Sequence, residues 1–184
     1  MSRIFLTLAV LNALALVMST ALGLGFMAER DAGVAAPAGH QPLTFGWFAT
    51  HMVFGLLTAV LTLFVHCLIF TYFLGTGRWV KEVAKAYQLP DHDLPRQTRE
   101  FKRQAFPPAL FAMLSVIGAV ATGAGAQTTP ESFWGLAHPV MAMLALALNG
   151  WAYVIEYRTV VANAKVMDQV MDEVERRRAA GQLA

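Results

Sequence analysis

Four long apolar segments constrain the fold of this chain more than any other feature. They cover about residues 4–26, 48–74, 109–126 and 133–157. Each can cross about 30 Å of hydrocarbon, which takes roughly 20 apolar residues in a helix. A membrane β-barrel would instead show alternating strands of about ten residues. We therefore predict an all-α bundle of four transmembrane helices in a lipid bilayer.

The composition supports a membrane protein. Apolar residues make up 57% of the chain and charged residues only 14%, which is too little charge for an ordinary soluble domain. The first segment has one feature of a secretory signal peptide, because Arg3 precedes it. Its 23 residues exceed the usual apolar region of about 7 to 15 residues. We expect it to be retained as a helix.

The basic residues predict the orientation, because Lys and Arg gather on the cytoplasmic side of membrane proteins. Of the fourteen, only Arg30 falls in the two loops of the other side. The rest are Arg3, Arg78, Lys81, Lys85, Arg96, Arg99, Lys102, Arg103, Arg158, Lys165, Arg176, Arg177 and Arg178. Both termini and the central loop, 75–108, are thus predicted to be cytoplasmic, in a bacterial inner membrane. Because these residues follow the membrane boundary and alternate with acids, no nucleic-acid partner is expected.

The central loop is predicted to begin with an amphipathic helix. Trp79, Val83 and Tyr87 share one face of residues 78–88, which we expect to lie in the headgroup zone. Pro107 and Pro108 then mark the start of the third helix.

Beyond the transmembrane domain, 1–157, the tail 158–184 is predicted to continue as a cytoplasmic helix. Its apolar stripe consists of Val160, Ala164, Met167, Met171 and Val174. Two alternatives fit this stripe. It packs back on the central loop, or segments 78–103 and 158–178 dock a partner subunit or a second copy of the chain.

Intramembrane histidines are the main candidates for chemistry, because a polar side chain in the bilayer is costly. His51 and His66 lie fifteen residues apart, which is about 22 Å along one helix and about 60° around it. Small and polar residues continue their face: Gly55, Thr58 and Thr62. The fourth segment repeats the pattern with His138, Ala142, Ala145, Asn149, Tyr153 and Glu156.

Two imidazoles facing one another across a helical bundle are typical axial ligands of a b-type haem. His51 and His138 each lie about two turns inside the same side, so we predict one haem between them. Gly55 would leave space for the macrocycle, and Asn149 and Tyr153 would flank a cofactor. His66 would serve a second haem, with Met113 as the other ligand, or bind a quinone oxygen.

Three other interpretations compete with haem. Copper would suit the histidines together with Met52, Met141 and Met143, because thioethers bind Cu(I). Alternatively, the polar residues only join helices by hydrogen bonds of about 0.6 kcal/mol each. Proton transfer is the third. His40 and His92 fall in loops and are expected to be solvated.

The architecture is similar to small four-helix b-type cytochromes and to the haem-bearing membrane anchors of quinone-linked dehydrogenases. This resemblance covers the helix number and His51, His66 and His138. It implies electron transfer between a quinone pool and a partner complex. A di-haem member of these groups supplies four ligands, whereas this chain has three intramembrane histidines.

No motif of a stand-alone enzyme is present, such as a Ser/His/Asp set or a glycine-rich phosphate loop. We therefore expect an electron-transfer subunit. The alternative is a membrane anchor or scaffold subunit of a larger assembly, without a cofactor of its own. Cys67 is the only cysteine, so an intrachain disulfide and a cysteine zinc cluster are both excluded.

Overall fold

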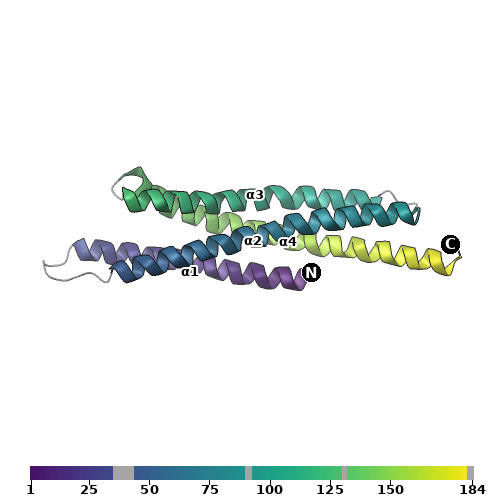
Figure 1. Cartoon of the computed structure of the whole chain (residues 1–184), viewed down its shortest axis with the longest axis horizontal. Coiled ribbons are helices and arrows are strands. Elements are labelled where there is room, and N and C mark those ends of the chain that lie inside the picture. Colours follow the sequence, from purple (N-terminus) through teal and green to yellow (C-terminus); the bar gives the residue numbers. More distant parts are fainter. Residues whose placement is uncertain (35–43, 90–92, 130–131, 182–184) are drawn as a thin grey trace.

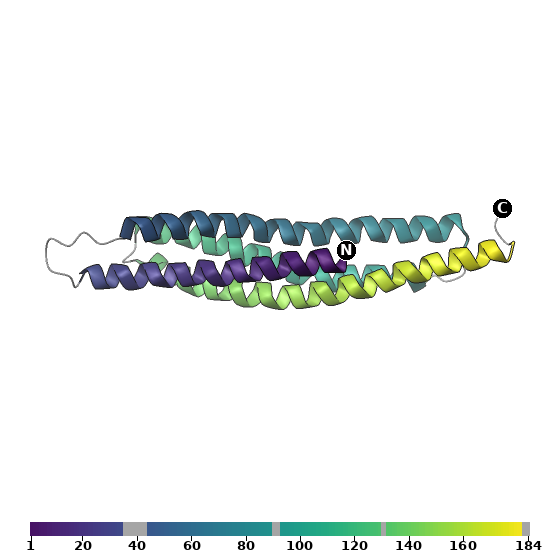
Figure 2. The ribbon, with the colours of Figure 1, turned by 90° about the horizontal axis from the view of Figure 1, so that it is seen from below.

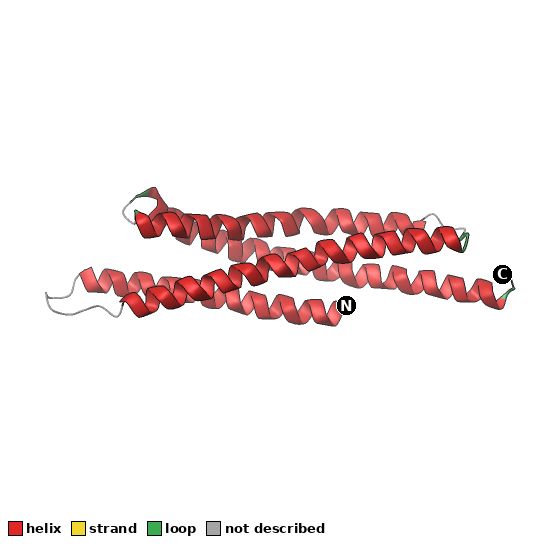
Figure 3. Cartoon of the chain, in the orientation of Figure 1, coloured by secondary structure: helices red, strands yellow, loops and turns green. Residues whose placement is uncertain are grey.

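The computed structural model describes residues 1–34, 44–89, 93–129 and 132–181, and every regular element among them is an α-helix (Figure 3). The helices are α1 (Ser2–Val34), α2 (Thr44–Ala86), α3 (Asp93–Thr128) and α4 (Phe133–Ala179). The prediction of an all-α chain with four helices is confirmed. The helices are longer than predicted, since α2 has 43 residues and α4 has 47.

All four helices are long and apolar enough to span a membrane. The surface of the bundle agrees with this, because large apolar side chains point outward. Leu57 and Val60 are each 65% exposed, and Leu136 is 69% exposed. Soluble monomers rarely present such a continuous apolar surface. We therefore treat the chain as an integral multi-pass membrane protein.

The helices form an antiparallel bundle in which each packs on its neighbours in sequence and α4 closes on α1 (Figures 1 and 2). As a result, α2 and α4 run parallel and lie diagonally opposite one another. We call the end with the α2–α3 connection and the C-terminus the basic end. The other end carries the α1–α2 and α3–α4 connections. The diagonal pair is the one on which the sequence places all three intramembrane histidines.

Three helices continue beyond the N-terminus of α1 at the basic end and form a stalk (Figure 1). Its core is a cluster of buried apolar residues from α2, α3, α4 and the turn after α2. They are Val80, Leu89, Leu94, Val166, Val170 and Val174. Packing of three apolar faces against one another removes this surface from water.

The predicted interfacial helix is part of the stalk. Residues 78–86 are the last turns of α2, and they do not form a separate element. Val80 is fully buried in the stalk core, and Trp79 and Val83 pack against that core. The apolar face that the sequence assigned to lipid headgroups therefore contacts other helices.

The tail packs back on the central segment, as one of the two alternatives predicted, and Val160 and Val174 of the predicted stripe are buried. Met171 from the predicted stripe is 43% exposed, whereas Val166 and Val170 are buried. The buried positions of α4 include Asn149, Tyr153, Glu156, Val160, Asn163, Val166, Val170 and Val174, which follow one another at spacings of three or four. That period is typical of helices that pack as a coiled coil. The predicted stripe did not include Asn163 because this residue is polar, although it occupies a core position.

Two prolines lie inside α3 and do not mark its start. Pro107 and Pro108 follow about four turns of helix that begin at Asp93. Those turns bury Leu94, Thr98 and Ala105. The helix continues through the prolines because its first half is held by packing in the stalk, which offsets the missing backbone donors.

Candidate functional site

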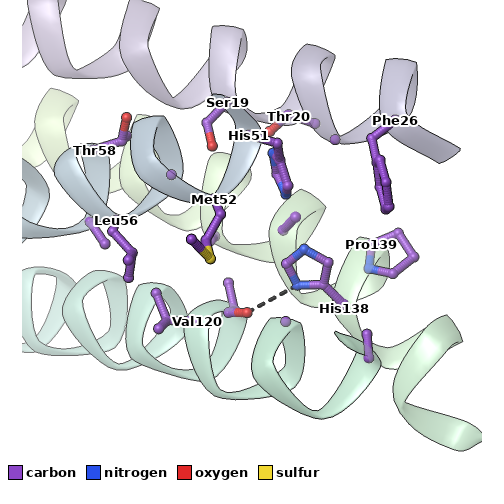
Figure 4. Close-up of a pocket in the computed structure, with 18 of the residues that line it drawn as sticks. Ser19, Thr20, Phe26, His51, Met52, Leu56, Thr58, Val120, His138 and Pro139 are labelled. Atoms are coloured by element: carbon purple, nitrogen blue, oxygen red, sulfur yellow. Dashed lines mark hydrogen bonds between the residues drawn. The ribbon is translucent and has the colours of Figure 1, made fainter. Parts of the chain in front are cut away.

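His51 and His138 face one another across the bundle near the end opposite the basic end (Figure 4). Their ring centroids are 6.0 Å apart and the ring planes make an angle of 62°. The rings meet because α2 and α4 are parallel and in register. The same register places Tyr153 beside His66, about 22 Å further along the bundle. The sequence-based expectation that the two imidazoles lie at one depth therefore agrees with their positions.

Each histidine ring rests against a glycine of the helix that precedes it. A Cβ atom on Gly23 of α1 would lie 2.9 Å from His51 Cε1, and a Cβ on Gly123 of α3 would lie 2.9 Å from His138 Cε1. Real Cβ atoms do not approach so closely, so any larger residue would displace the ring. The α1–α2 and α3–α4 hairpins thus present their histidines in equivalent ways from opposite sides.

Hydrogen bonding fixes the His138 ring. Its Nδ1 lies 3.0 Å from the carbonyl oxygen of Ala119, and because a carbonyl only accepts, Nδ1 is the donor. The lone pair of His138 is then on Nε2. In contrast, His51 Nδ1 is buried and has no hydrogen-bond partner among the residues that the structure describes. An unpaired buried nitrogen is unfavourable unless something else satisfies it.

A cavity of about 490 Å³ surrounds the two rings. This volume lies within the range of about 300–1,000 Å³ for small-molecule and cofactor sites. Most of its lining is apolar or small, and it includes Gly55, which was predicted from the sequence to leave space, together with Ala142 and Ala145. Figure 4 shows Phe26, Met52, Leu56 and Val120 around the same space.

His66 is held in a different way, and its predicted roles need correction. The ring is fully buried. Its Nδ1 lies 2.7 Å from Glu156 Oε1 and its Nε2 lies 2.9 Å from Asn149 Oδ1. Both nitrogens are therefore occupied, and neither has a lone pair free for a metal or a donor free for a quinone. Met113 is half-buried on α3, and the His66 partners come from α4.

Asn149 and Tyr153, which we expected to flank a cofactor, belong to this buried cluster. Tyr153 stacks on the His66 ring with 5.1 Å between centroids. Its hydroxyl donates to Asn12 Oδ1 at 2.6 Å, and the Thr62 hydroxyl donates to the same oxygen at 3.0 Å. One polar cluster therefore joins α1, α2 and α4.

Two residues of this buried cluster, Asn12 and Glu156, were not predicted from the sequence to belong to a site. Asn12 is the only strongly polar residue in the middle of its apolar segment, and this isolation is a signal that it would face the interior. Glu156 was assigned to the end of its helix, but α4 continues to Ala179 and buries it fully. Its position three residues after Tyr153 places it beside His66 in the register of the diagonal pair.

The remaining candidates are less organised. Met52 and Met143 line the cavity, while Met141 lies beside Gly118, where a Cβ would be 2.6 Å from Met141 Cε. Among the described residues, no group of three or more His, Cys, Asp or Glu side chains is arranged to hold a metal ion. His40 and His92 lie outside the described residues.

No known family model matches the chain, and no curated protein or solved structure is detectably similar to it.

Proposed function

We propose that His51 and His138 bind one b-type haem and that the protein is an electron-transfer subunit of the membrane. The distance between the two rings carries the proposal. Imidazole nitrogens that share one metal ion each lie about 2.0–2.1 Å from it, which separates the ring centroids by about 6 Å. The 6.0 Å between these rings agrees with that requirement.

The surroundings of the rings also suit a haem. Ligand histidines usually donate their second nitrogen to a carbonyl, as His138 does to Ala119. Gly23 and Gly123 seat the rings without side chains of their own. A bound haem would cycle between two oxidation states and carry one electron. The chain's own residues would hold the iron on both sides, and the apolar cavity lining would exclude water.

The charge distribution suggests how such a protein lies in its membrane. By the positive-inside rule, the basic end faces the cytoplasm, so the termini and the stalk are cytoplasmic. The histidine pair then lies in the outer half of the bilayer. We propose that the electron is exchanged between a quinone pool and a partner complex, in a bacterial inner membrane.

The test is a reduced-minus-oxidised absorption spectrum of the purified protein, expressed with adequate haem. We expect Soret and alpha bands that both His51→Ala and His138→Ala abolish. His92→Ala is the matched control and should leave the bands unchanged, since this residue is remote in sequence from the pair. A protein without these bands, or bands that depend on only one of the two histidines, would refute the bis-histidine assignment.

A second function deserves a test because of the stalk. Three packed helices projecting from a membrane bundle offer a surface for another subunit. On the stalk, a groove between α3 and α4 is lined by residues that include Gln97, Phe101 and Lys165. A scaffold subunit would be colourless, and its Lys165→Glu variant would no longer bind the partner subunits that the wild-type protein binds. A coloured protein that keeps all its partners after this change would exclude the scaffold function.

A further inference from the structure

The buried cluster around His66 and Glu156 has no role in haem binding, yet it is the most polar part of the bundle interior. Both side chains have no exposed surface, and Nδ1 and Oε1 are 2.7 Å apart. Two ionisable groups at this depth are costly in a membrane protein and commonly mark ion or proton pathways. The hydrogen-bond network allows the protons of the pair to be assigned.

Asn149 fixes one proton on His66. The Asn149 amide nitrogen donates to the Ala145 carbonyl at 2.7 Å, so the amide oxygen faces His66. His66 Nε2 must therefore donate to that oxygen. Only one further proton is shared between Nδ1 and Oε1. Whichever atom holds this proton, the pair has no net charge, which suits its burial.

Glu156 keeps one free binding position. Its second oxygen, Oε2, is buried and has no hydrogen-bond partner among the described residues. A buried carboxylate oxygen without a donor is unfavourable. A proton on Oε2 would remove the negative charge from this unpartnered oxygen and turn the neutral pair into one with a single positive charge.

A second unpartnered oxygen lies further along α4 toward the basic end. Asn163 Oδ1 is also buried without a partner. The Asn163 amide nitrogen donates to the Tyr72 hydroxyl at 3.1 Å and to the Thr76 hydroxyl at 3.0 Å. The Tyr72 hydroxyl lies 3.5 Å from the Val160 carbonyl, about one helical turn beyond Glu156.

Two sets of contacts lie on the cavity side of the pair. The Asn149 amide leads to the backbone carbonyls of Ala145 and Ala112, which have no proton to exchange. Tyr153 contacts His66 by ring stacking, and its hydroxyl donates away to Asn12. The hydrogen bonds of Tyr153, Asn12 and Thr62 thus form a branch that does not include Glu156. Thr76, in contrast, is only half-buried and lies toward the basic end.

We propose that His66 and Glu156 form a buried proton-binding site that exchanges protons with the solution at the basic end through Tyr72, Asn163 and Thr76. In the binding step, a hydronium ion at the basic end gives up a proton and becomes water. An O–H bond forms at Glu156 Oε2, and the charge of the pair changes from zero to plus one. The site operates whether or not the cavity holds a haem.

The groups that face the pair do not titrate in its place at neutral pH. The Tyr153 ring of α4 stacks on His66, and the phenolic hydroxyl of Tyr72, on α2, lies near the Val160 carbonyl on the proposed pathway. Asn12 of α1 and the Ala112 carbonyl of α3 are uncharged. The closest described carboxylate toward the basic end of α4 is Asp168, which is exposed.

Infrared spectroscopy of the full chain in lipid nanodiscs tests the proposal. As the pH falls, we expect a protonated carboxylic acid band that shifts in D₂O and is absent in Glu156→Gln. Glu82→Gln is the control, because Glu82 is exposed and paired with Arg78. Selective ¹⁵N labelling of histidine in the wild-type chain does not depend on the folding of Glu156→Gln. It reports the step if the shared proton starts on Glu156 Oε1, because His66 Nδ1 is then the atom that becomes protonated. A wild-type pair with no pH-dependent change in either signal would be a purely structural ion pair, and the proposal would be wrong.

Proton access is tested by the rate at which this band responds to a pH jump. Asn163→Leu should slow the response by roughly tenfold or more, because it removes a positioned group of the pathway. Thr62→Val is the matched variant on the cavity side and should leave the rate unchanged. The reverse result, slowing by Thr62→Val alone, would overturn the proposed direction of access.

Discussion

Asn12 is the residue whose loss should most clearly test the packing of the bundle interior. Its Oδ1 accepts from Tyr153 at 2.6 Å and from Thr62 at 3.0 Å, and its Nδ2 donates to the Thr58 carbonyl at 3.4 Å. Hydrogen bonds between membrane helices contribute about 0.6 kcal/mol on average and up to about 1.7 kcal/mol. The short bond to Tyr153 belongs near the upper value. Leaving a buried hydroxyl unpaired costs about 1–3 kcal/mol.

We therefore expect Asn12→Leu to lower the free energy of unfolding by about 2–3 kcal/mol. Tyr153→Phe removes the orphaned hydroxyl, so the double variant should be more stable than the sum of the single losses predicts, by about 1 kcal/mol. Reversible unfolding in mixed micelles with a denaturing detergent measures all four corners of this cycle. Strictly additive losses would show that the Asn12–Tyr153 contact does not contribute to stability.

Three further changes test other parts of the molecule. Gly123→Leu should displace His138 and abolish the haem bands, whereas Gly150→Leu should not, because a Cβ at Gly150 meets nothing within 4 Å. Val170→Asp should destabilise the stalk by about 2–4 kcal/mol in thermal unfolding, since it buries a charge, while Met171→Asp at a 43% exposed position should be nearly neutral. Cys67 is exposed on α2 within an apolar span. A water-soluble maleimide should therefore label it slowly in intact bilayers and quickly after denaturation.

The helices and the histidine pair could be predicted from the sequence because each depends on a local pattern. A run of apolar residues fixes a membrane helix regardless of its partners. His51 and His138 could be paired because two parallel helices of similar length share one register, so equal depth follows from counting residues. Both inferences need only the rise per residue and the thickness of the bilayer.

The role of His66 could not be predicted in this way, because it depends on which atoms occupy its two nitrogens. The sequence shows a buried histidine, but the Glu156 and Asn149 contacts depend on the rotation of α4 about its axis. That rotation is set by packing in the stalk, where the heptad spacing begins at a polar residue. A period of 3.5 and a period of 3.6 diverge by about 20° per heptad. The predicted stripe therefore agrees with the buried face at Val160 and Val174 but not at Met171.

The two candidate sites differ in what they lack, and this difference argues for separate functions. The His51–His138 site combines a cavity of about 490 Å³ with a buried His51 Nδ1 that has no hydrogen-bond partner among the described residues, which fits the proposed haem. At the His66–Glu156 site, one carboxylate oxygen has no donor among the described residues. A group as small as a proton or a water molecule completes it. Because the sites are separated by about 22 Å along α2, a charge gained at one would reach the other only weakly. A direct readout of each site is therefore needed, since the state of one does not reveal the state of the other.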